Sequence, residues 1–313
     1  MDIVATLQAR LASLFPGAHS RGLQAVRLHI DAAIAHLDRG REGDATAFTD
    51  AIYRCNQAFE GSVKEAYRVL AGKDPGRTTP AKIEAFLTEQ DLLRQRVLNQ
   101  FTNYRTAWRN ASTHDYTLDF DENEALLAIV SVTVFAIVLT EQMRSKLAAE
   151  AAEKAAPHAS APIANTVLLR DEVERHIVAF AHRHKLDVNA AASDYEGALA
   201  GYLTAQFATT PEIKVDVGLR INGREADIAV RRGDERLAIE LKYMHKPLES
   251  RVLSGVEYLA ELLSRGFTDG ILLATVAGEQ EVIATSAVTS RGQTVRAVLG
   301  TSLSKLLVDG KVD

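Results

Sequence analysis

The stretch from Lys214 to Tyr243, KVDVGLRINGREADIAVRRGDERLAIELKY, contains the clearest strand pattern in the chain. Apolar and polar residues alternate in three runs that are separated by two short turn sequences. The runs are Lys214–Ile221, Glu225–Arg231 and Arg236–Tyr243, and the turns are Asn222-Gly223 and Gly233-Asp234. Alternation with a period of two is typical of a half-buried strand, and Asn-Gly is a strong signal for a two-residue hairpin. The stretch therefore predicts a meander of three strands.

The sequence on either side of this meander predicts helices and one further strand. Apolar residues recur at helical spacing before and after it, and a short apolar run follows. We expect helices at about Val167–Lys185, Ala191–Phe207 and Leu248–Ser264, and a buried strand at Gly270–Val276. Residues 166–313 are therefore predicted to form an α/β domain. The stretch after Gly278 gives no clear prediction.

The first half of the chain shows only helical periodicity. Apolar residues recur every three or four positions, as in Ile52, Cys55, Phe59 and Val63. The breaks between helices have the composition of loops, at Phe15-Pro16-Gly17, Arg39-Gly40-Arg41 and Gly72–Gly76. Residues 1–147 are therefore predicted to form an all-α helical bundle, so that the whole chain is an α+β protein of two domains.

The boundary between the two domains is predicted from a capping signal and a change in composition. Asp121 followed three residues later by Glu124 is a capping box, which places the start of the last long helix of the bundle. Residues 148–165 are rich in alanine and contain Pro157 and Pro162. We expect these residues to form a linker.

The composition excludes several classes of protein. Of the 313 residues, 47% are hydrophobic, and Cys55 is the single cysteine, so global disorder and an internal disulfide framework are excluded. One cysteine suits a reducing compartment, and we expect a cytoplasmic protein. The apolar run Ala125–Thr140 is shorter than the about 20 residues of a membrane span, which favours a buried helix and no membrane contact.

Three polar residues of the meander have the chemistry of a metal-dependent hydrolase. Glu240 and Lys242 are two apart on one strand and share a face, and Asp227 lies on the preceding strand. Two carboxylates that converge there would bind a hard cation such as Mg²⁺, and Lys242 would orient water or neutralise charge. The pattern Glu-x-Lys recurs at Glu212 and Lys214, but no acidic strand precedes that copy.

The arrangement of Asp227 with Glu240-Leu241-Lys242 resembles the PD-(D/E)xK nuclease superfamily, which has the restriction-endonuclease-like fold. The resemblance covers about residues 166–290. It implies a phosphodiesterase dependent on Mg²⁺ or Mn²⁺ that acts on nucleic acid, usually DNA, with Asp227 and Glu240 as metal ligands. It also implies an acidic residue on the upstream helix, for which Glu196 has the expected position. The residue before Asp227 is Ala226, where the family pattern has proline.

A second set of residues lies before the last helix of the bundle, in Arg109-Asn110-Ala111-Ser112-Thr113-His114-Asp115-Tyr116. An arginine can hold a scissile phosphate, and a histidine can move protons near neutral pH. Together they suit RNA cleavage without a metal. The same loose spacing occurs at Arg170/His176 and Arg175/His182, each within a predicted helix.

The helical half with Arg109, Asn110, His114 and Tyr116 before its last helix resembles the HEPN superfamily, whose signature is R-x4–6-H. This resemblance covers about residues 1–147. It implies a homodimer in which both motifs line one cleft, and in many members an endoribonuclease that needs no cofactor. Arg109 would bind phosphate, His114 would be the acid and base, and Asn110 and Tyr116 would support them. The residue that orients the site would be Glu60 or Glu65, between which no motif decides.

Both resemblances together predict a nuclease of the prokaryotic defence or toxin type. Net charge is −5, so tight binding to nucleic acid through bulk charge is not expected, and local groups must carry it. Two alternatives remain open. The helical half could be only a module for dimerisation or for binding nucleic acid or a partner, or the C-terminal half could be a sensor without turnover.

Overall fold

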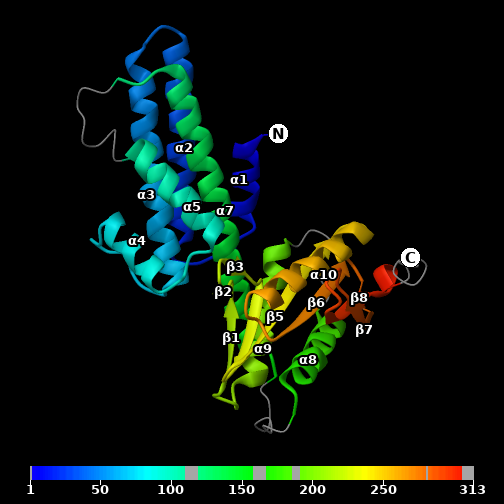
Figure 1. Cartoon of the computed structure of the whole chain (residues 1–313). Coiled ribbons are helices and arrows are strands. Elements are labelled where there is room, and N and C mark those ends of the chain that lie inside the picture. The colour runs from blue at the N-terminus through cyan, green and yellow to red at the C-terminus, as the bar shows by residue number, and fades with distance from the viewer. Residues whose placement is uncertain (1, 110–118, 158–166, 185–190, 280, 305–313) are drawn as a thin grey trace. The chain divides into compact units, whose positions relative to one another are not determined.

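The computed structural model describes residues 2–109, 119–157, 167–184, 191–279 and 281–304. Over these residues the protein is α+β, with helices in the N-terminal part and a mixed sheet in the C-terminal part (Figure 1). The chain divides into two compact units, Met1–Lys146 and Leu147–Asp313. The expected combination of a helical half and an α/β half is therefore confirmed at the level of architecture.

The described residues of the first unit form α-helices and a π-helical turn (Figure 1). They are α1 (Ile3–Ala12), α2 (Ser20–Arg41), α3 (Thr46–Leu70), α4 (Pro80–Glu89), α5 (Gln95–Tyr104), the π-helical turn η1 (Arg105–Arg109) and α7 (Glu122–Ala155), whose last residues belong to the second unit. The Phe59 ring lies at the centre of the core. Its centroid is 4.7 Å from that of Tyr104, 5.0 Å from that of Phe101 and 5.1 Å from that of Phe135.

The predicted start of α7 is confirmed. Asp121 N–H donates to Glu124 Oε2 and Glu124 N–H donates to Asp121 Oδ1, both at 2.9 Å, which is the reciprocal pair of a capping box. The most apolar window of α7 has a mean hydropathy of 2.0, and half of it is buried. By length and composition α7 could cross a membrane, but its buried residues, such as Ile129, Phe135 and Met143, belong to the helical core.

The loop predicted at Arg39-Gly40-Arg41 is wrong, because these residues form the last turn of α2. Gly40 is needed there for packing rather than for a turn. A Cβ atom added to it would lie 2.3 Å from Cε1 of Phe48, a residue of α3. The glycine therefore allows α2 and α3 to approach closely at this level.

The predicted linker also differs from the structure, because α7 continues to Ala155. Residues 148–155 are therefore helical, and residues 158–166 lie outside the described residues. The end of α7 packs on a helix of the second unit, α9 (Ala192–Phe207), where Gln206 Nε2 donates to the Pro157 carbonyl at 2.7 Å. Alanine has the highest helix propensity, so an alanine-rich stretch without proline continues a helix easily.

The second unit contains a six-stranded mixed sheet in the order β1-β4-β5-β6-β8-β7. Its strands are β1 (Ile213–Val217), β4 (Ile228–Arg232), β5 (Glu235–Met244), β6 (Asp269–Val276), β7 (Val282–Val288) and β8 (Thr294–Gly300). β1, β4 and β5 are antiparallel, as the meander predicts, and β6 is parallel to both β5 and β8. The strands β7 and β8 are antiparallel and had no sequence prediction.

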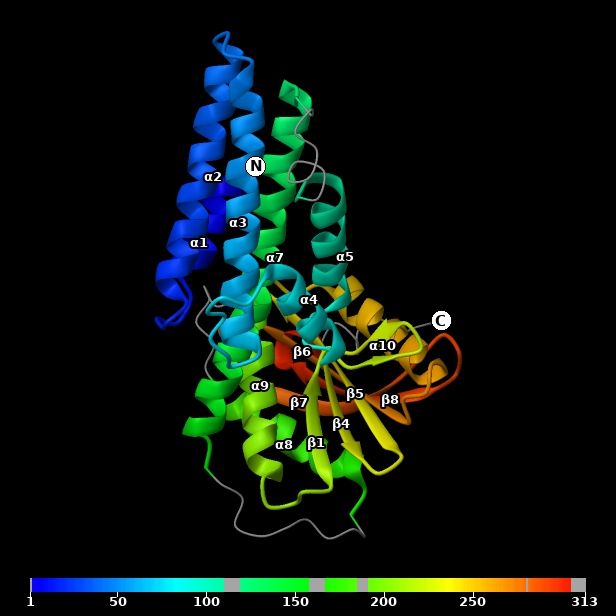
Figure 2. The same ribbon diagram turned by 90° about the vertical axis from the view of Figure 1, so that its left-hand side faces the viewer.

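Helices cover both faces of this sheet (Figure 2). The side chains of α8 (Leu169–Arg183) and α9 form a core with Ile228, Ile239 and Ile271 on one face. The side chains of α10 (Glu249–Ser264) form a second core with Ala238, Leu272 and Ala274 on the other face. All three helices and the strand β6 agree with the sequence predictions.

A short hairpin interrupts the meander between β1 and β4. Its strands are β2 (Arg220–Ile221) and β3 (Arg224–Glu225), and the turn residues Asn222 and Gly223 have φ values of 47° and 81°. Positive φ at both positions is the geometry of the predicted two-residue turn. The predicted strand Glu225–Arg231 is not continuous, however, because the chain bends at Asp227 before β4 begins.

Candidate functional site

Asp227 lies at the bend that joins β3 to β4. The pairing of β4 with β5 ends at Ile228 and Ile239, so the next position along each strand brings Asp227 opposite Glu240. The carboxylate Oδ2 of Asp227 accepts a hydrogen bond of 2.9 Å from the backbone N–H of Leu241. This bond fixes the Asp227 side chain over the C-terminal half of β5.

Glu240 and Lys242 lie on β5 with their side chains on the α10 face of the sheet. Their neighbours in the parallel strand β6 are Leu272 and Ala274, which belong to the core beneath α10. Lys242 Nζ donates to Glu240 Oε1 at 2.5 Å. The structure thus brings Asp227, Glu240 and Lys242 together on one surface.

The electrostatics of the site disfavour the ionised form of Glu240. Its side chain is only 6% exposed. Burial raises the pKa of the Glu240 carboxyl well above its ordinary value, the nearby negative charge of Asp227 raises this pKa further, and the ammonium of Lys242 opposes both effects. The two carboxyl groups are close enough to hydrogen-bond when one of them carries a proton.

The residues present fit a divalent cation. Glu240 Oε2 is buried and has no hydrogen-bond donor within the part of the chain that the structure describes. A buried acceptor without a donor is costly, and a cation beside Asp227 and Glu240 would remove this cost. Among the described residues, no group of three or more His, Cys, Asp or Glu side chains is arranged so that it could hold a metal ion by itself. Two carboxylates suffice for Mg²⁺, which commonly takes its other ligands from water and substrate phosphates.

Helix α10 supplies a residue that sequence reasoning missed. Tyr258 Oη donates to the Glu225 carbonyl at 2.8 Å, two residues before Asp227. Burial raises the pKa of the Tyr258 hydroxyl, and the negative charge of Glu240 raises it further, so this hydroxyl lies close to the carboxylates. No sequence signal could have selected Tyr258, because its position depends on the packing of α10 against the sheet.

Gly255 of α10 allows the helix to approach the same site. A Cβ atom added to Gly255 would lie 2.7 Å from Leu272 Cδ1 and 3.4 Å from Cε of Lys242. The stem of Lys242 is therefore held between β5 and α10, which limits the positions that its ammonium can take.

Glu196 occupies a different place from the other predicted site residues. It is buried on α9, whose side chains pack on the face of the sheet opposite to Glu240 and Lys242. The described structure therefore brings together three of the four residues predicted for the C-terminal half, and it gives Glu196 a position in the other helix layer.

Of the residues predicted for the helical half, the structure describes only Arg109. Asn110, His114 and Tyr116 lie outside the described residues. Arg109 ends the π-helical turn η1, and its Nη2 is 3.5 Å from Glu60 Oε1 on α3. Of the two predicted orienting residues, Glu60 thus contacts Arg109, and Glu65 pairs with Arg68 at 3.1 Å.

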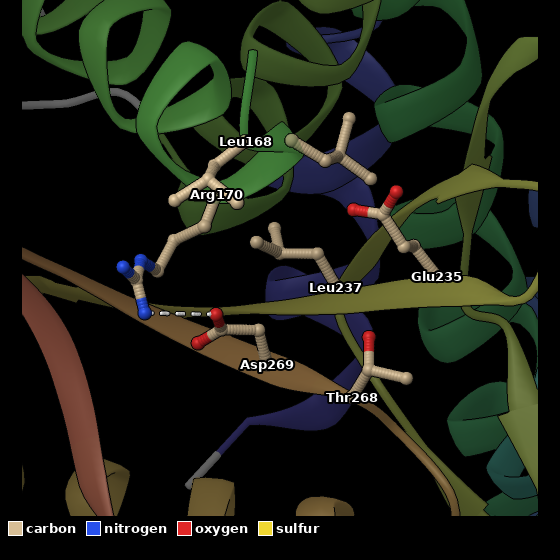
Figure 3. A pocket seen from close by; sticks show the side chains of 7 residues that line it. Leu168, Arg170, Glu235, Leu237, Thr268 and Asp269 are labelled. Atoms are coloured by element: carbon tan, nitrogen blue, oxygen red, sulfur yellow. Dashed lines mark hydrogen bonds and ion pairs between the residues drawn. The ribbon is translucent and has the colours of Figure 1, made fainter. Parts of the chain in front are cut away.

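The two other arginine–histidine pairs have structural roles. Arg170 Nη1 is 3.1 Å from Asp269 Oδ2 across a hollow of about 210 Å³ at the start of α8 (Figure 3). His176 is buried and lies 3.3 Å from Glu172. Arg175 also pairs with Glu172, while His182 is exposed. Arg170 thus contacts β6, and Arg175 and His176 make contacts within α8, as expected for ordinary helix residues.

No family model matches this chain, and comparisons with characterised proteins and with solved structures likewise find no match.

Proposed function

We propose that this protein is a nuclease of the defence or toxin type whose C-terminal unit hydrolyses phosphodiester bonds, most readily in DNA, with Mg²⁺ or Mn²⁺. The observation that carries the proposal is the meeting of Asp227, Glu240 and Lys242 on one face of the sheet, with a buried Glu240 oxygen that has no donor among the described residues. A buried carboxyl group whose pKa is raised by burial and by a second carboxylate is typical of a functional site.

Each residue has a defined role in this proposal. Asp227 and Glu240 would hold the cation, which supplies activation of water and neutralisation of phosphate charge. Lys242, with its side chain 20% exposed, can reach a phosphate or the attacking water and donate to it. Tyr258 keeps the Asp227 bend in place through the Glu225 carbonyl.

The test is cleavage of plasmid DNA by the full chain with Mg²⁺ and with EDTA. We expect cleavage only with Mg²⁺, and a loss of roughly 100-fold or more in rate for Asp227→Ala and Lys242→Ala. Lys214→Ala is the matched control, since Lys214 is an exposed lysine in the other Glu-x-Lys sequence, and it should keep the full rate. Equal rates for Lys242→Ala and Lys214→Ala would refute the proposal, as would cleavage that persists in EDTA.

A second candidate function is RNA cleavage without metal by the helical unit, in a homodimer of the kind that the HEPN resemblance implies. The supporting observation is the contact of Arg109 with Glu60, which ties the motif arginine to a carboxylate on a neighbouring helix. The guanidinium is then positioned to bind phosphate. In the alternative, this unit only dimerises or binds.

RNA cleavage in EDTA distinguishes these two roles for the helical unit. We expect single-stranded RNA to be cut by the wild type, and the rate to fall roughly 100-fold in Arg109→Ala and His114→Ala. Arg96→Ala, which changes an exposed arginine of α5, is the control. If the wild type binds RNA but does not cut it, the helical unit is a binding module.

A further inference from the structure

A polar hollow of about 720 Å³ lies on the surface of the first unit and is formed by side chains of α2 and α3 alone. This volume is within the usual range for small-molecule sites. The lining side chains are polar or aromatic and include two histidines, an arginine and two carboxylates. Glu60, the partner of Arg109, is one of them, so the hollow borders the predicted RNA-cleaving motif.

The charges around the hollow leave one cation without a counterion. Asp50 pairs with Arg39 at 2.9 Å, and Glu60 pairs with Arg109 at 3.5 Å. Arg54 is exposed and has no ion pair within the described part of the chain. Each lining carboxylate is thus balanced by an arginine, and Arg54 makes the hollow attractive to an anion.

His29 of α2 lines the same hollow as Arg54. Burial lowers the pKa of His29, and the positive charge of Arg54 lowers it further. A neutral imidazole offers one donor and one acceptor, so His29 can form hydrogen bonds with either a sugar hydroxyl or a base.

An aromatic ring stands beside the cation. Tyr53 precedes Arg54 on α3, lines the same hollow and is 49% exposed, which is a large fraction for an aromatic residue of a helical bundle. Single-stranded nucleic acids are held by a combination of aromatic faces that stack on bases and cations that contact phosphates. Adjacent amides, Asn56 and Gln57, provide hydrogen-bonding groups within the hollow.

We propose that this hollow binds a nucleotide unit of single-stranded RNA, with the phosphate on Arg54 and the base on Tyr53. This inference rests on the second candidate function and deepens it, because it assigns a substrate-binding surface next to Arg109. A single strand is required, since a paired base has no free face to stack on Tyr53.

The experiment measures the binding of a fluorescein-labelled oligouridylate to the full chain by fluorescence anisotropy in EDTA. Arg54→Gln should weaken binding at least about 10-fold and reduce the salt dependence of binding by about one phosphate contact. Tyr53→Ala should weaken it about 5-fold or more. The matched control is Arg21→Gln, an exposed arginine at the start of α2, for which we expect the affinity of the wild type.

Failure of this inference can be told apart from failure of the proposed functions. Suppose that the wild type cuts RNA in EDTA and that Arg54→Gln and Arg21→Gln bind oligouridylate equally well. This result would overturn the hollow as the binding surface and would leave the activity in place. Wild-type protein that neither binds nor cuts RNA overturns both. Weaker binding by Arg54→Gln with no cleavage by any variant supports the hollow and removes only the catalytic role.

Discussion

Glu240 has two carboxylate oxygens in very different surroundings. Oε1 accepts from Lys242, whereas Oε2 is buried without a donor among the described residues. A protein that evolved for stability alone would replace such a group, and residues of this kind are retained where a ligand needs them. In the proposed site, a bound cation would offset the cost of burying the Glu240 charge.

Replacement of Glu240 by glutamine should stabilise the metal-free protein. Because the pKa of Glu240 is raised in the folded protein, the folded state binds a proton more tightly than the unfolded state does. The wild type therefore loses stability as the pH rises above the ordinary value of 4.5. We expect Glu240→Gln and the wild type to have similar free energies of unfolding at about pH 5. At about pH 8 the variant should be more stable by about 2 kcal/mol.

Denaturant unfolding of the two proteins in EDTA at both pH values measures this difference. Glu235→Gln, at an exposed position of the same strand, is the control and should show no such gain. If the wild type is more stable than Glu240→Gln at the higher pH, the attraction between Glu240 and Lys242 outweighs the cost of burial and the repulsion by Asp227.

Tyr258→Phe should weaken metal binding without unfolding the protein. The change removes only the hydroxyl that donates to the Glu225 carbonyl and so loosens the bend at Asp227. We expect about 10-fold lower affinity for Mn²⁺ by titration calorimetry, the smaller end of the effect that loss of an outer-shell hydrogen bond has on a metal site.

The control for this variant is Tyr202→Phe, on the helix layer that covers the opposite face of the sheet. It should bind Mn²⁺ as the wild type does. If Tyr258→Phe also keeps the full affinity, Tyr258 has only a structural role.

At the scale of elements, the junction of α7 with α9 is the clearest departure from the sequence prediction. A Cβ atom added to Gly201 of α9 would lie 2.0 Å from the backbone carbonyl oxygen of Ala149. Gly201 and Ala149 approach each other this closely only because residues 148–155 continue α7 as a helix instead of forming a flexible linker.

Gly201→Ala should therefore destabilise the second unit by about 1–3 kcal/mol, because a backbone atom cannot move aside as a side chain can. Thermal unfolding checks the value, with Thr204→Ala, one turn further along α9, as the control. An unchanged melting temperature in Gly201→Ala would mean that α7 does not reach α9 in solution.

The sequence predicted those elements whose signals are local. The Asn222-Gly223 turn requires positive φ, and the Asp121–Glu124 capping box uses only neighbouring groups, so both could be identified from a few residues. Asp227, Glu240 and Lys242 could be grouped for the same reason, because a short turn aligns their strands.

Features that depend on tertiary packing were missed. Gly40 was predicted to lie in a loop because glycine is common in loops, and its close approach to Phe48 of another helix cannot be read from the local sequence. Tyr258 was missed because α10 comes near the site only when the helix packs on the sheet. The strands β7 and β8 gave no prediction. β7 is mostly exposed on both faces, so it lacks the alternation that marks a half-buried strand.

On the scale of the whole molecule, each compact unit has its own core and its own candidate chemistry. The two activities should therefore be independent. Arg109→Ala should leave the Mg²⁺-dependent cleavage of DNA within about 2-fold of the wild type, and Asp227→Ala should do the same for cleavage of RNA in EDTA. Loss of both activities in either variant would instead indicate one composite site.

The central claim is that Asp227 and Glu240 together hold a divalent cation. Crystals of the full chain grown with Mn²⁺ test it directly by anomalous diffraction, with Asp227→Asn as the comparison. We expect an anomalous peak in contact with both carboxylates in the wild type and none at this position in the variant. A wild-type map without a peak there, or the same peak in both proteins, would contradict it.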